Sequence, residues 1–440
     1  MGDVIGERDS ESGISRRELI VRAGVGAGGL VLSGAAAGPV WARARGAAAD
    51  QITIGFVSPR TGPAAGFGEP DPYVIGLAQK AFAKGLAIGG KTYSVKIVDK
   101  DSQSNPAHAA QVANDLLHGS NVDLMLATST PESVNPVSDA SEAAGTPCIS
   151  TVVPWEAWYF GRGAKPGKPS PFRYTFHFCF GVQQFDEAYT HLWPQVPTNK
   201  KVGVMWPNDS DGNAIRGALG PLLKKAGYTI VDPGAYTDGT NDYSSQISKF
   251  KSANCQIFNT FPIPPDFATF WRQAAQQGFK PKIVQVAKTG LFPSQISSLG
   301  KIGVNIASAA YWTPTYPYTS SLTRITSKAL AAGYEKSSGK QWNQQAGPSL
   351  ALFDVAAAVL KASGNPKDKT AVANAMKTLK VQTPIGVLHW GTGPVANVVA
   401  TPIIGGQWVK GKGKYPLDFV LCEHSSDPKV PIAGHLKAYA

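Results

Sequence analysis

The chain has 440 residues, of which 43% are hydrophobic and only 16% charged, and its formal net charge is +12. This apolar content excludes global disorder, and the length is typical of two or three domains. The densest basic runs, at 165–168 and 410–414, are loop-like and do not form one face. We therefore expect no nucleic-acid partner, and a positive field that suits anionic solutes or an anionic partner surface.

The first 49 residues have the pattern of an export signal. The segment 15–20 reads Ser-Arg-Arg-Glu-Leu-Ile and resembles a twin-arginine motif, and a weakly apolar stretch follows it. The alanines at 47–49 form an A-x-A cleavage site. A transmembrane anchor is the alternative, but Arg22 and several glycines interrupt the stretch. We predict a cleaved twin-arginine signal peptide at 1–49 and a periplasmic location, with no lipid anchor because no Cys precedes Cys148.

Short β-branched runs then alternate with helical patterns. The predicted strands are 52–57, 94–99, 122–127 and 147–151, and the predicted helices between them are 73–84, 106–117 and 131–144. Strands separated by helices of this length indicate a parallel, doubly wound sheet. Ligands of such sheets bind outside the carboxyl ends of the strands.

The pattern restarts after an aromatic loop at 155–170 and an extended run at 172–180. The second series has predicted strands at 201–206, 229–233, 256–260, 282–287 and 304–311, and helices at 185–193, 213–226, 243–252 and 266–277. Helices at 322–335, 350–363 and 370–379 and strands within 384–421 complete the chain. We predict an α/β protein of two lobes that exchange the chain more than once.

One stretch carries a family resemblance. Residues 51–68 read QITIGFVSPRTGPAAGFG, and similar signposts follow in order at 98–106, 123–129, 145–150, 208–212, 386–390 and 406–409. The set resembles the type I periplasmic solute-binding proteins of ABC importers, in their leucine/isoleucine/valine- and amide-binding branch. The resemblance spans about 51–425. It implies two Rossmann-like, doubly wound lobes joined by three crossover strands, near 176–180, 308–311 and 394–398, and a cleft that closes by hinge bending.

The implied lobe bounds are 51–178 plus 311–394 for lobe 1, and 179–310 plus 395–440 for lobe 2. In lobe 1, Thr130 stands before Pro131 and can cap a helix whose first-turn N–H groups suit a carboxylate or carbonyl oxygen; an ordinary capped helix without a ligand is the alternative. Arg60 could pair with an anion or be a solvated loop charge, and Trp155 could cover the ligand or join a local core. The ligand-binding candidates here are Arg60, Phe67, Thr128, Ser129, Thr130, Ser150, Thr151, Val152 and Trp155.

Lobe 2 departs from the amino-acid binders of this family at two positions. Where many of them have an aromatic ring, this chain has Asp211, and near the point where they offer a carboxylate to the ligand's ammonium it has Lys288. Lys288 would suit a solute that bears a carboxylate, or it is a solvated charge at a strand end. The ligand-binding candidates here are Asp211, Phe261, Lys288 and Trp312, the last together with Tyr311 as an aromatic wall after the second crossover.

Nothing in the sequence assembles catalytic residues. Lys288-Thr289-Gly290 precedes a Ser-x-x-Lys at 298–301, the reverse of the serine β-lactamase order. The seven His lack metal-ligand spacing, and the G-x-G-x-x-G at 24–29 lies inside the signal segment instead of after a strand. We expect no catalytic residue, no metal and no cofactor. The four widely separated Cys allow one disulfide or free buried thiols.

These observations together predict an exported substrate-binding protein of an ABC transporter. It would capture a small organic solute between its lobes, namely an aromatic or branched carboxylate, an amide or an amino acid. It would then present the closed form to permease subunits in the inner membrane, and we expect it to be a monomer. The alternatives are a secreted hydrolase or cofactor enzyme on a similar scaffold, and the sensory domain of a receptor.

Overall fold

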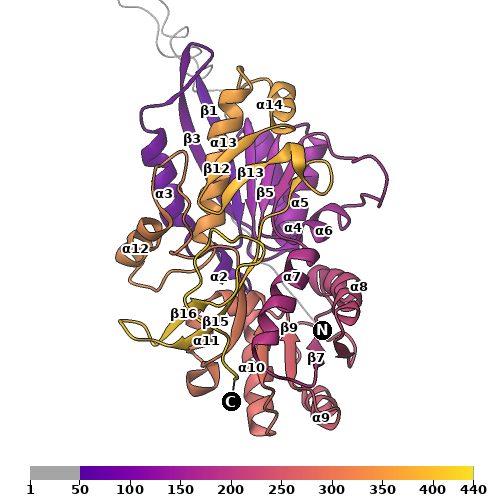
Figure 1. The fold of residues 1–440 in the computed structure, drawn as a ribbon. Coiled ribbons are helices and arrows are strands. Elements are labelled where there is room, and N and C mark those ends of the chain that lie inside the picture. The colour runs from indigo at the N-terminus through magenta and orange to yellow at the C-terminus, as the bar shows by residue number, and fades with distance from the viewer. Residues whose placement is uncertain (1–49, 440) are drawn as a thin grey trace, which may run out of the picture. The chain divides into compact units, whose positions relative to one another are not determined.

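Residues 50–439 are described by a computed structural model, and they contain two seven-stranded sheets, each covered by helices, and a two-stranded hairpin (Figure 1). The predicted signal peptide lies outside the described residues. Within 50–439, no helix has both the length and the apolar character needed to cross a membrane.

The first sheet has the strand order β14-β6-β5-β4-β1-β3-β2, and all neighbours run parallel except β2, which pairs antiparallel with β3. Its strands are β1 (Gln51–Ser58), β2 (Leu86–Ile88), β3 (Lys91–Asp101), β4 (Leu124–Thr128), β5 (Cys148–Thr151), β6 (Thr175–Phe178) and β14 (Val398–Val399). The helices on this sheet are α2 (Ala65–Gly68), α3 (Asp71–Phe82), α4 (Pro106–Asn114), which continues as a π-turn η1 (Asp115–Gly119), α5 (Pro131–Ala143), α6 (Trp155–Tyr159), α12 (Ser327–Ser338), α13 (Ala346–Ala362) and α14 (Lys369–Met376). The hairpin β12 (Lys380–Thr383) and β13 (Gly386–His389), followed by η5 (Trp390–Thr392), lies against α13.

The second sheet has the order β16-β15-β11-β10-β9-β7-β8, with parallel strands from β8 to β11 and antiparallel pairing of β11, β15 and β16. Its strands are β7 (Lys201–Met205), β8 (Thr229–Val231), β9 (Ile257–Thr260), β10 (Ile283–Val286), β11 (Ala307–Ala310), β15 (Ile404–Lys410) and β16 (Leu417–Leu421). The helices are α7 (Val182–Leu192) with η2 (Trp193–Gln195), α8 (Ser210–Lys225), α9 (Ser244–Ser252), α10 (Pro264–Gln276) and α11 (Pro293–Ser297), with turns η3 (Lys288–Leu291) and η4 (Gly300–Gly303).

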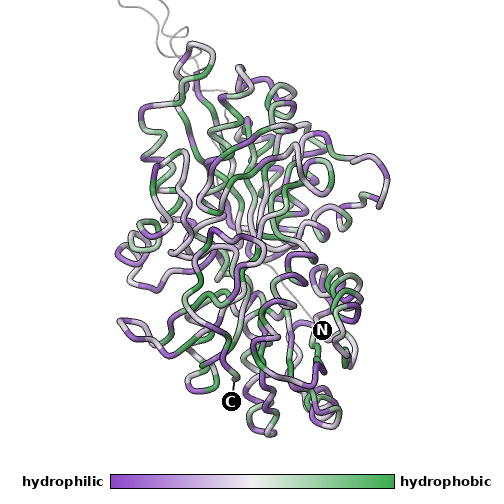
Figure 2. Tube along the Cα trace, in the orientation of Figure 1, coloured by the Kyte–Doolittle hydropathy of each residue, from purple (hydrophilic) through white to green (hydrophobic). Residues whose placement is uncertain are grey.

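Alternate residues of the central strands face two different cores. Ile54 and Phe56 of β1 pack in the core that α3 and α13 cover, whereas Val57 packs in the core under α4 and α5. In β4, Leu126 joins the first core and Met125 the second. Burial on both faces explains why β4 and the second half of β1 are largely apolar, and Figure 2 shows this hydrophobic character along the inner strands.

The chain passes between the two sheets three times, after Phe178, after Ala310 and after Val399. The predicted α/β architecture of two doubly wound lobes joined by three crossings is confirmed. One detail differs from the expected lobe bounds, because Val398–Val399 pair with β6 of the first sheet and not with the second. The bounds themselves remain a prediction.

Three local expectations differ from the structure. The predicted helix 322–335 starts later, at Ser327, because the buried carboxylate of Asp354 accepts hydrogen bonds from Ser320 Oγ (2.7 Å) and the Leu322 N–H (2.7 Å) and holds that segment as a turn. The expected loop after residue 154 begins with helix α6, and β2 forms a hairpin with β3 that we did not predict. The four Cys are buried free thiols.

Candidate functional site

A small cavity lies between the two sheets, outside the carboxyl ends of strands from both. Its volume is about 40 Å³, and since about 10–15 Å³ admits one water, it has room for only a few water-sized groups. Each sheet contributes loops that follow its strands, the position expected for ligands of doubly wound sheets. The lining residues are Phe67, Thr130, Val152, Pro154, Phe180, Phe185, Asp211, Phe261, Ala287, Lys288, Leu291, Ala309, Tyr311 and Ile403.

A larger hollow of about 640 Å³ lies elsewhere and opens widely to solvent. Its charged groups are already paired, Arg60 with Asp99 and Lys340 with Glu69. The smaller cavity is lined by aromatic rings and shared by the loops of both sheets, so we take it as the candidate site.

The loops of the first sheet reach the cavity in a strained conformation. Ser129, Thr130 and Val152 have positive φ values of 74°, 68° and 59°, which residues other than Gly rarely adopt. The two loops hold each other, because the Thr130 N–H donates to the Val152 carbonyl (3.1 Å). Thr130 occupies the N-cap position of α5 with Pro131 first in the helix, but its hydroxyl caps no backbone N–H. Backbone strain of this kind concentrates at ligand-binding loops.

A buried histidine supports the second of these loops from behind. The Nε2 of His177 lies 2.8 Å from the Val153 carbonyl, and its Nδ1 lies 2.8 Å from Ser150 Oγ. Because a carbonyl only accepts, Nε2 carries the proton and Nδ1 accepts from the Ser150 hydroxyl. The ring stacks on Trp158 at 4.9 Å, and burial lowers the pKa of His177 to about 3. The imidazole is therefore a neutral, structural strut for the loop that lines the cavity.

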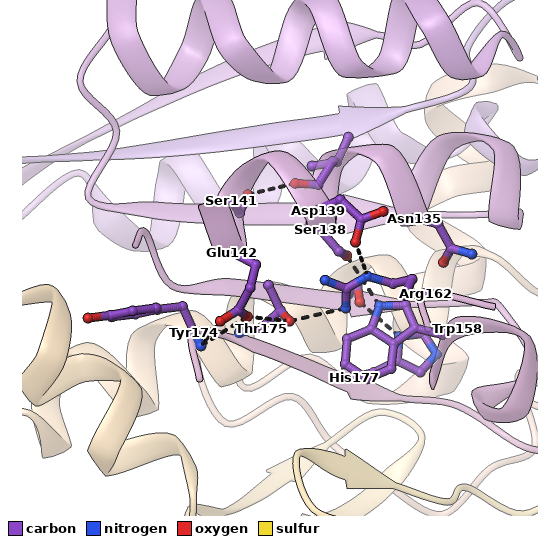
Figure 3. A network of polar contacts seen from close by, with 12 residues as sticks. Asn135, Ser138, Asp139, Ser141, Glu142, Trp158, Arg162, Tyr174, Thr175 and His177 are labelled. Carbon is purple, nitrogen blue, oxygen red and sulfur yellow. Dashed lines mark hydrogen bonds and ion pairs between the residues drawn. The ribbon is translucent and has the colours of Figure 1, made fainter. Parts of the chain in front are cut away.

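Arg162 secures the segment around this histidine (Figure 3). Its side chain is 1% exposed, pairs with Asp139 (2.7 Å) and donates to Thr175 Oγ1 (3.1 Å). The guanidinium also lies 4.7 Å from the centre of the Trp158 ring. Cation–π contact and the charge-assisted hydrogen bonds thus tie the excursion between β5 and β6 onto α5.

Aromatic rings from both sheets form the apolar wall of the cavity. Phe180 stacks on Tyr311 with ring centres 5.4 Å apart, and Phe185 meets Phe261 edge-on at 5.0 Å. Phe180 and Tyr311 lie on the segments that cross between the sheets. Phe67 reaches the wall from α2. This wall suits an aromatic or branched apolar group.

The other end of the cavity holds a buried charge cluster. Lys288 Nζ lies 2.7 Å from Asp209 Oδ2 and 3.0 Å from Asp211 Oδ2, and the three side chains are at most 12% exposed. Burial lowers the pKa of Lys288, but Asp211, Asp209 and Glu132 raise it by more, so that it ends well above its ordinary value. Burial raises the pKa of Asp211 to about 7, against the lowering effect of Lys288. Two carboxylates thus already neutralise the lysine that was expected to attract a ligand carboxylate.

Six of the sequence-predicted residues line the cavity together: Phe67, Thr130, Val152, Asp211, Phe261 and Lys288. The other seven make contacts elsewhere. Thr128 and Ser129 bond each other (2.9 Å) in the buried loop, and Ser150 and Thr151 direct their hydroxyls to β6. Arg60 forms an ion pair with Asp99, Trp155 packs against Phe160, and Trp312 donates a hydrogen bond to Ser327 Oγ (3.0 Å). The assignment of all seven as ligand contacts remains a prediction.

Tyr311, expected in an aromatic wall, lines the cavity, whereas three other lining residues were not predicted from the sequence, namely Phe180, Phe185 and Ile403. Phe185 stands on the apolar face of α7 and has the pattern of an ordinary core residue. Phe180 offered a weak signal, since it is an aromatic residue at a predicted crossover. His177 and Arg162 gave none, because their roles depend on contacts with residues distant in the chain.

Comparisons with known proteins identify the family of this chain. The sequence profile described as "Periplasmic binding protein" matches residues 51–412. The chain is 23% identical over 353 residues to the Leu/Ile/Val-binding protein homolog 3 of Brucella melitensis, covering 80% of this chain and 90% of that protein. It is 24% identical over 233 residues to an amino acid binding protein of Pseudomonas aeruginosa, covering 52% of this chain and 58% of that protein.

Solved structures share the fold. A leucine binding protein from Thermotoga maritima superposes with a TM-score of 0.68 at 17% identity, covering 84% of this chain and 97% of that one. A solute binding protein of an ABC transporter from R. palustris, solved with 4-hydroxybenzoate, gives a TM-score of 0.68 at 18% identity, covering 84% and 96%. The matched family consists of solute-binding proteins and not of enzymes. This chain belongs to the periplasmic binding protein family.

Proposed function

We propose that this protein is the exported substrate-binding component of an ABC transporter. It captures a small organic solute between its lobes, closes by bending at the three crossing segments, and presents the closed form to permease subunits in the inner membrane. The observation that carries the proposal is the composition of the cavity wall, to which loops of both sheets contribute. A solute that contacts both lobes stabilises the closed state over the open one.

The size of the cavity supports a hinge. At about 40 Å³ it admits a few waters but no ring or branched side chain. A solute of the proposed size therefore enters only when the lobes separate, and the crossings after Phe178, Ala310 and Val399 are the segments that can bend.

The aromatic wall supports a solute with an aromatic or branched body. The relatives and related structures point the same way, because they include a leucine binding protein, an amino acid binding protein and a solute binding protein solved with 4-hydroxybenzoate. We therefore assign the solute to the amino acids and the small aromatic or branched compounds with one polar end.

A ligand screen tests this proposal. Purified protein, stripped of ligand by unfolding and refolding, is heated with leucine, phenylalanine, 4-hydroxybenzoate, short amides and sugars in parallel. A ligand at 100 times its dissociation constant adds about 2.7 kcal/mol of stability, so the midpoint of unfolding rises clearly for one chemical class. No shift with any amino acid, amide or aromatic compound, or a shift only with sugars, would contradict the proposal.

Export through the twin-arginine route is a second part of the proposal. Replacing Arg16 and Arg17 together by Lys keeps the charge but removes the motif, so we expect the protein to remain in the cytoplasm, as measured by cell fractionation. The matched control is Arg43→Lys with Arg45→Lys, outside the motif, which should be exported normally. Normal export of the first variant would exclude this route.

A further inference from the structure

The cavity is lined by a carboxylate that has one oxygen without a hydrogen-bond partner among residues 50–439. Asp211 stands in the first turn of α8 and is 4% exposed. Its Oδ2 receives the Lys288 ammonium at 3.0 Å, whereas its Oδ1 is buried without a hydrogen-bond partner. A buried carboxylate oxygen without a donor is costly, and such groups are rare in folded proteins. Asp211 lines the cavity, so a molecule bound there can supply the missing donor.

The charges around this oxygen favour a positive donor. Lys288 carries one positive charge, and the carboxylates of Asp209 and Asp211 both lie within 3.0 Å of its ammonium. Glu132, from α5 of the other lobe, adds a further negative charge that acts on both Asp211 and Lys288. At pH 7.5, above the pKa of about 7 to which burial raises Asp211, that carboxyl is mainly ionised. The cluster then has an excess of negative charge, which the N-terminus of α8 stabilises in part.

We propose that Asp211 is a specificity-determining residue that accepts a hydrogen bond from a protonated amine of the solute, an inference that rests on the proposed function. The amine donates to Oδ1 and balances the excess negative charge, while the apolar body lies against the aromatic wall of Phe180, Phe261 and Tyr311. Compounds with the same body and only a carboxylate lack the donor and meet a repulsive field. This preference is opposite to the one that Lys288 suggests when read from the sequence alone.

Two matched sets of compounds test the inference. The aromatic set is 2-phenylethylamine, phenylalanine and 3-phenylpropanoate, and the branched set is isoamylamine, leucine and 4-methylpentanoate. Calorimetric titration at pH 7.5 should show the nitrogen-containing members of at least one set binding ten times or more tightly than its plain carboxylate. Asp211→Asn, which is isosteric, should weaken the amine-containing compounds by 10- to 100-fold, as for a lost hydrogen bond to a charged group, and should not weaken the carboxylate.

Asp238→Asn is the control variant. Asp238 belongs to the same acidic surroundings, and its negative charge acts on Lys288 through space, but it does not line the cavity. Its affinities should change less than threefold. If Asp211→Asn does not fold, the ranking of the six compounds with the native protein decides the matter.

The outcomes separate the two proposals. Tighter binding of the plain carboxylates, or equal loss in Asp211→Asn and Asp238→Asn, overturns the amine assignment and leaves the solute-binding function in place. Failure of all six compounds counts against the amine assignment, and together with a flat screen of amides and aromatic acids it counts against the proposed function as well.

Discussion

Replacing Lys288 by Met is expected to destabilise the protein by about 3–5 kcal/mol, the usual cost of removing one partner from a buried ion pair. The lysine is 10% exposed and contacts both Asp209 and Asp211. Without its ammonium, two buried carboxylates face each other and Glu132 with no counter-charge. Urea unfolding at pH 7.5 measures the loss.

The size of this effect comes from the unpaired carboxylates, and two further variants can show it. Adding Asp209→Asn and Asp211→Asn to Lys288→Met removes the buried charges and should restore most of the lost stability. Lys340→Met is the matched control, because Lys340 is 62% exposed in its pair with Glu69, and exposed pairs contribute only about 0–1 kcal/mol. Equal losses of stability in Lys288→Met and Lys340→Met would show that solvent screens the charges of the cluster as it screens an exposed ion pair.

Acidification from pH 6.5 to pH 5 is expected to remove about 2 kcal/mol of stability through His177 alone. The pKa of His177 is about 3 in the folded protein because the ring is buried, against about 6.5 in an unfolded chain. Between these values the unfolded state binds more protons, so stability rises with pH up to about 6.5 and is fully present above it. Each unit of pH below 6.5 costs about 1.4 kcal/mol until pH 3 is reached.

His177→Gln isolates this contribution, because other buried groups titrate in the opposite sense. Burial raises the pKa of Asp71 and of Asp354 to about 7, so their protonation favours the folded state as the pH falls. The difference in unfolding free energy between native protein and His177→Gln cancels these terms. That difference should shrink by about 2 kcal/mol between pH 6.5 and pH 5. A constant difference would mean that His177 is not held neutral.

The alternation of strands and helices determined much of the fold before any contact was known. Strands such as 52–57 and 122–127 are short apolar runs, and the helix 131–144 starts at a Pro that follows Thr130. These signals are local, and the structure has strands and a helix there, with ends shifted by one or two residues. The predicted start of α12 was wrong because it depends on hydrogen bonds to a carboxylate distant in the sequence, that of Asp354.

The candidate site was predicted only in outline. The family resemblance, together with the rule that parallel sheets bind ligands at strand ends, selected thirteen candidates. Six of them line the cavity, namely Phe67, Thr130, Val152, Asp211, Phe261 and Lys288. The sequence could not show that Ser150 turns its hydroxyl toward His177, because this depends on how β5 pairs with β6. The position of a residue along a strand can be predicted from neighbouring residues, whereas the hydrogen-bond partner of its side chain depends on residues distant in the sequence.

The sequence by itself determined the two-lobed α/β class, because hydrophobic periodicity and turn residues act over a few positions, and its family resemblance pointed to the loops of the candidate site. Only the tertiary structure decided the charge of the site. The sequence shows Lys288 as a single positive charge, but in the fold Asp209 and Asp211, which lie 79 and 77 positions earlier in the chain, contact it at 2.7 and 3.0 Å. Electrostatic character depends on distances through space and on burial, so a lysine that suggests an anion site in the sequence becomes part of an acidic cluster in the fold.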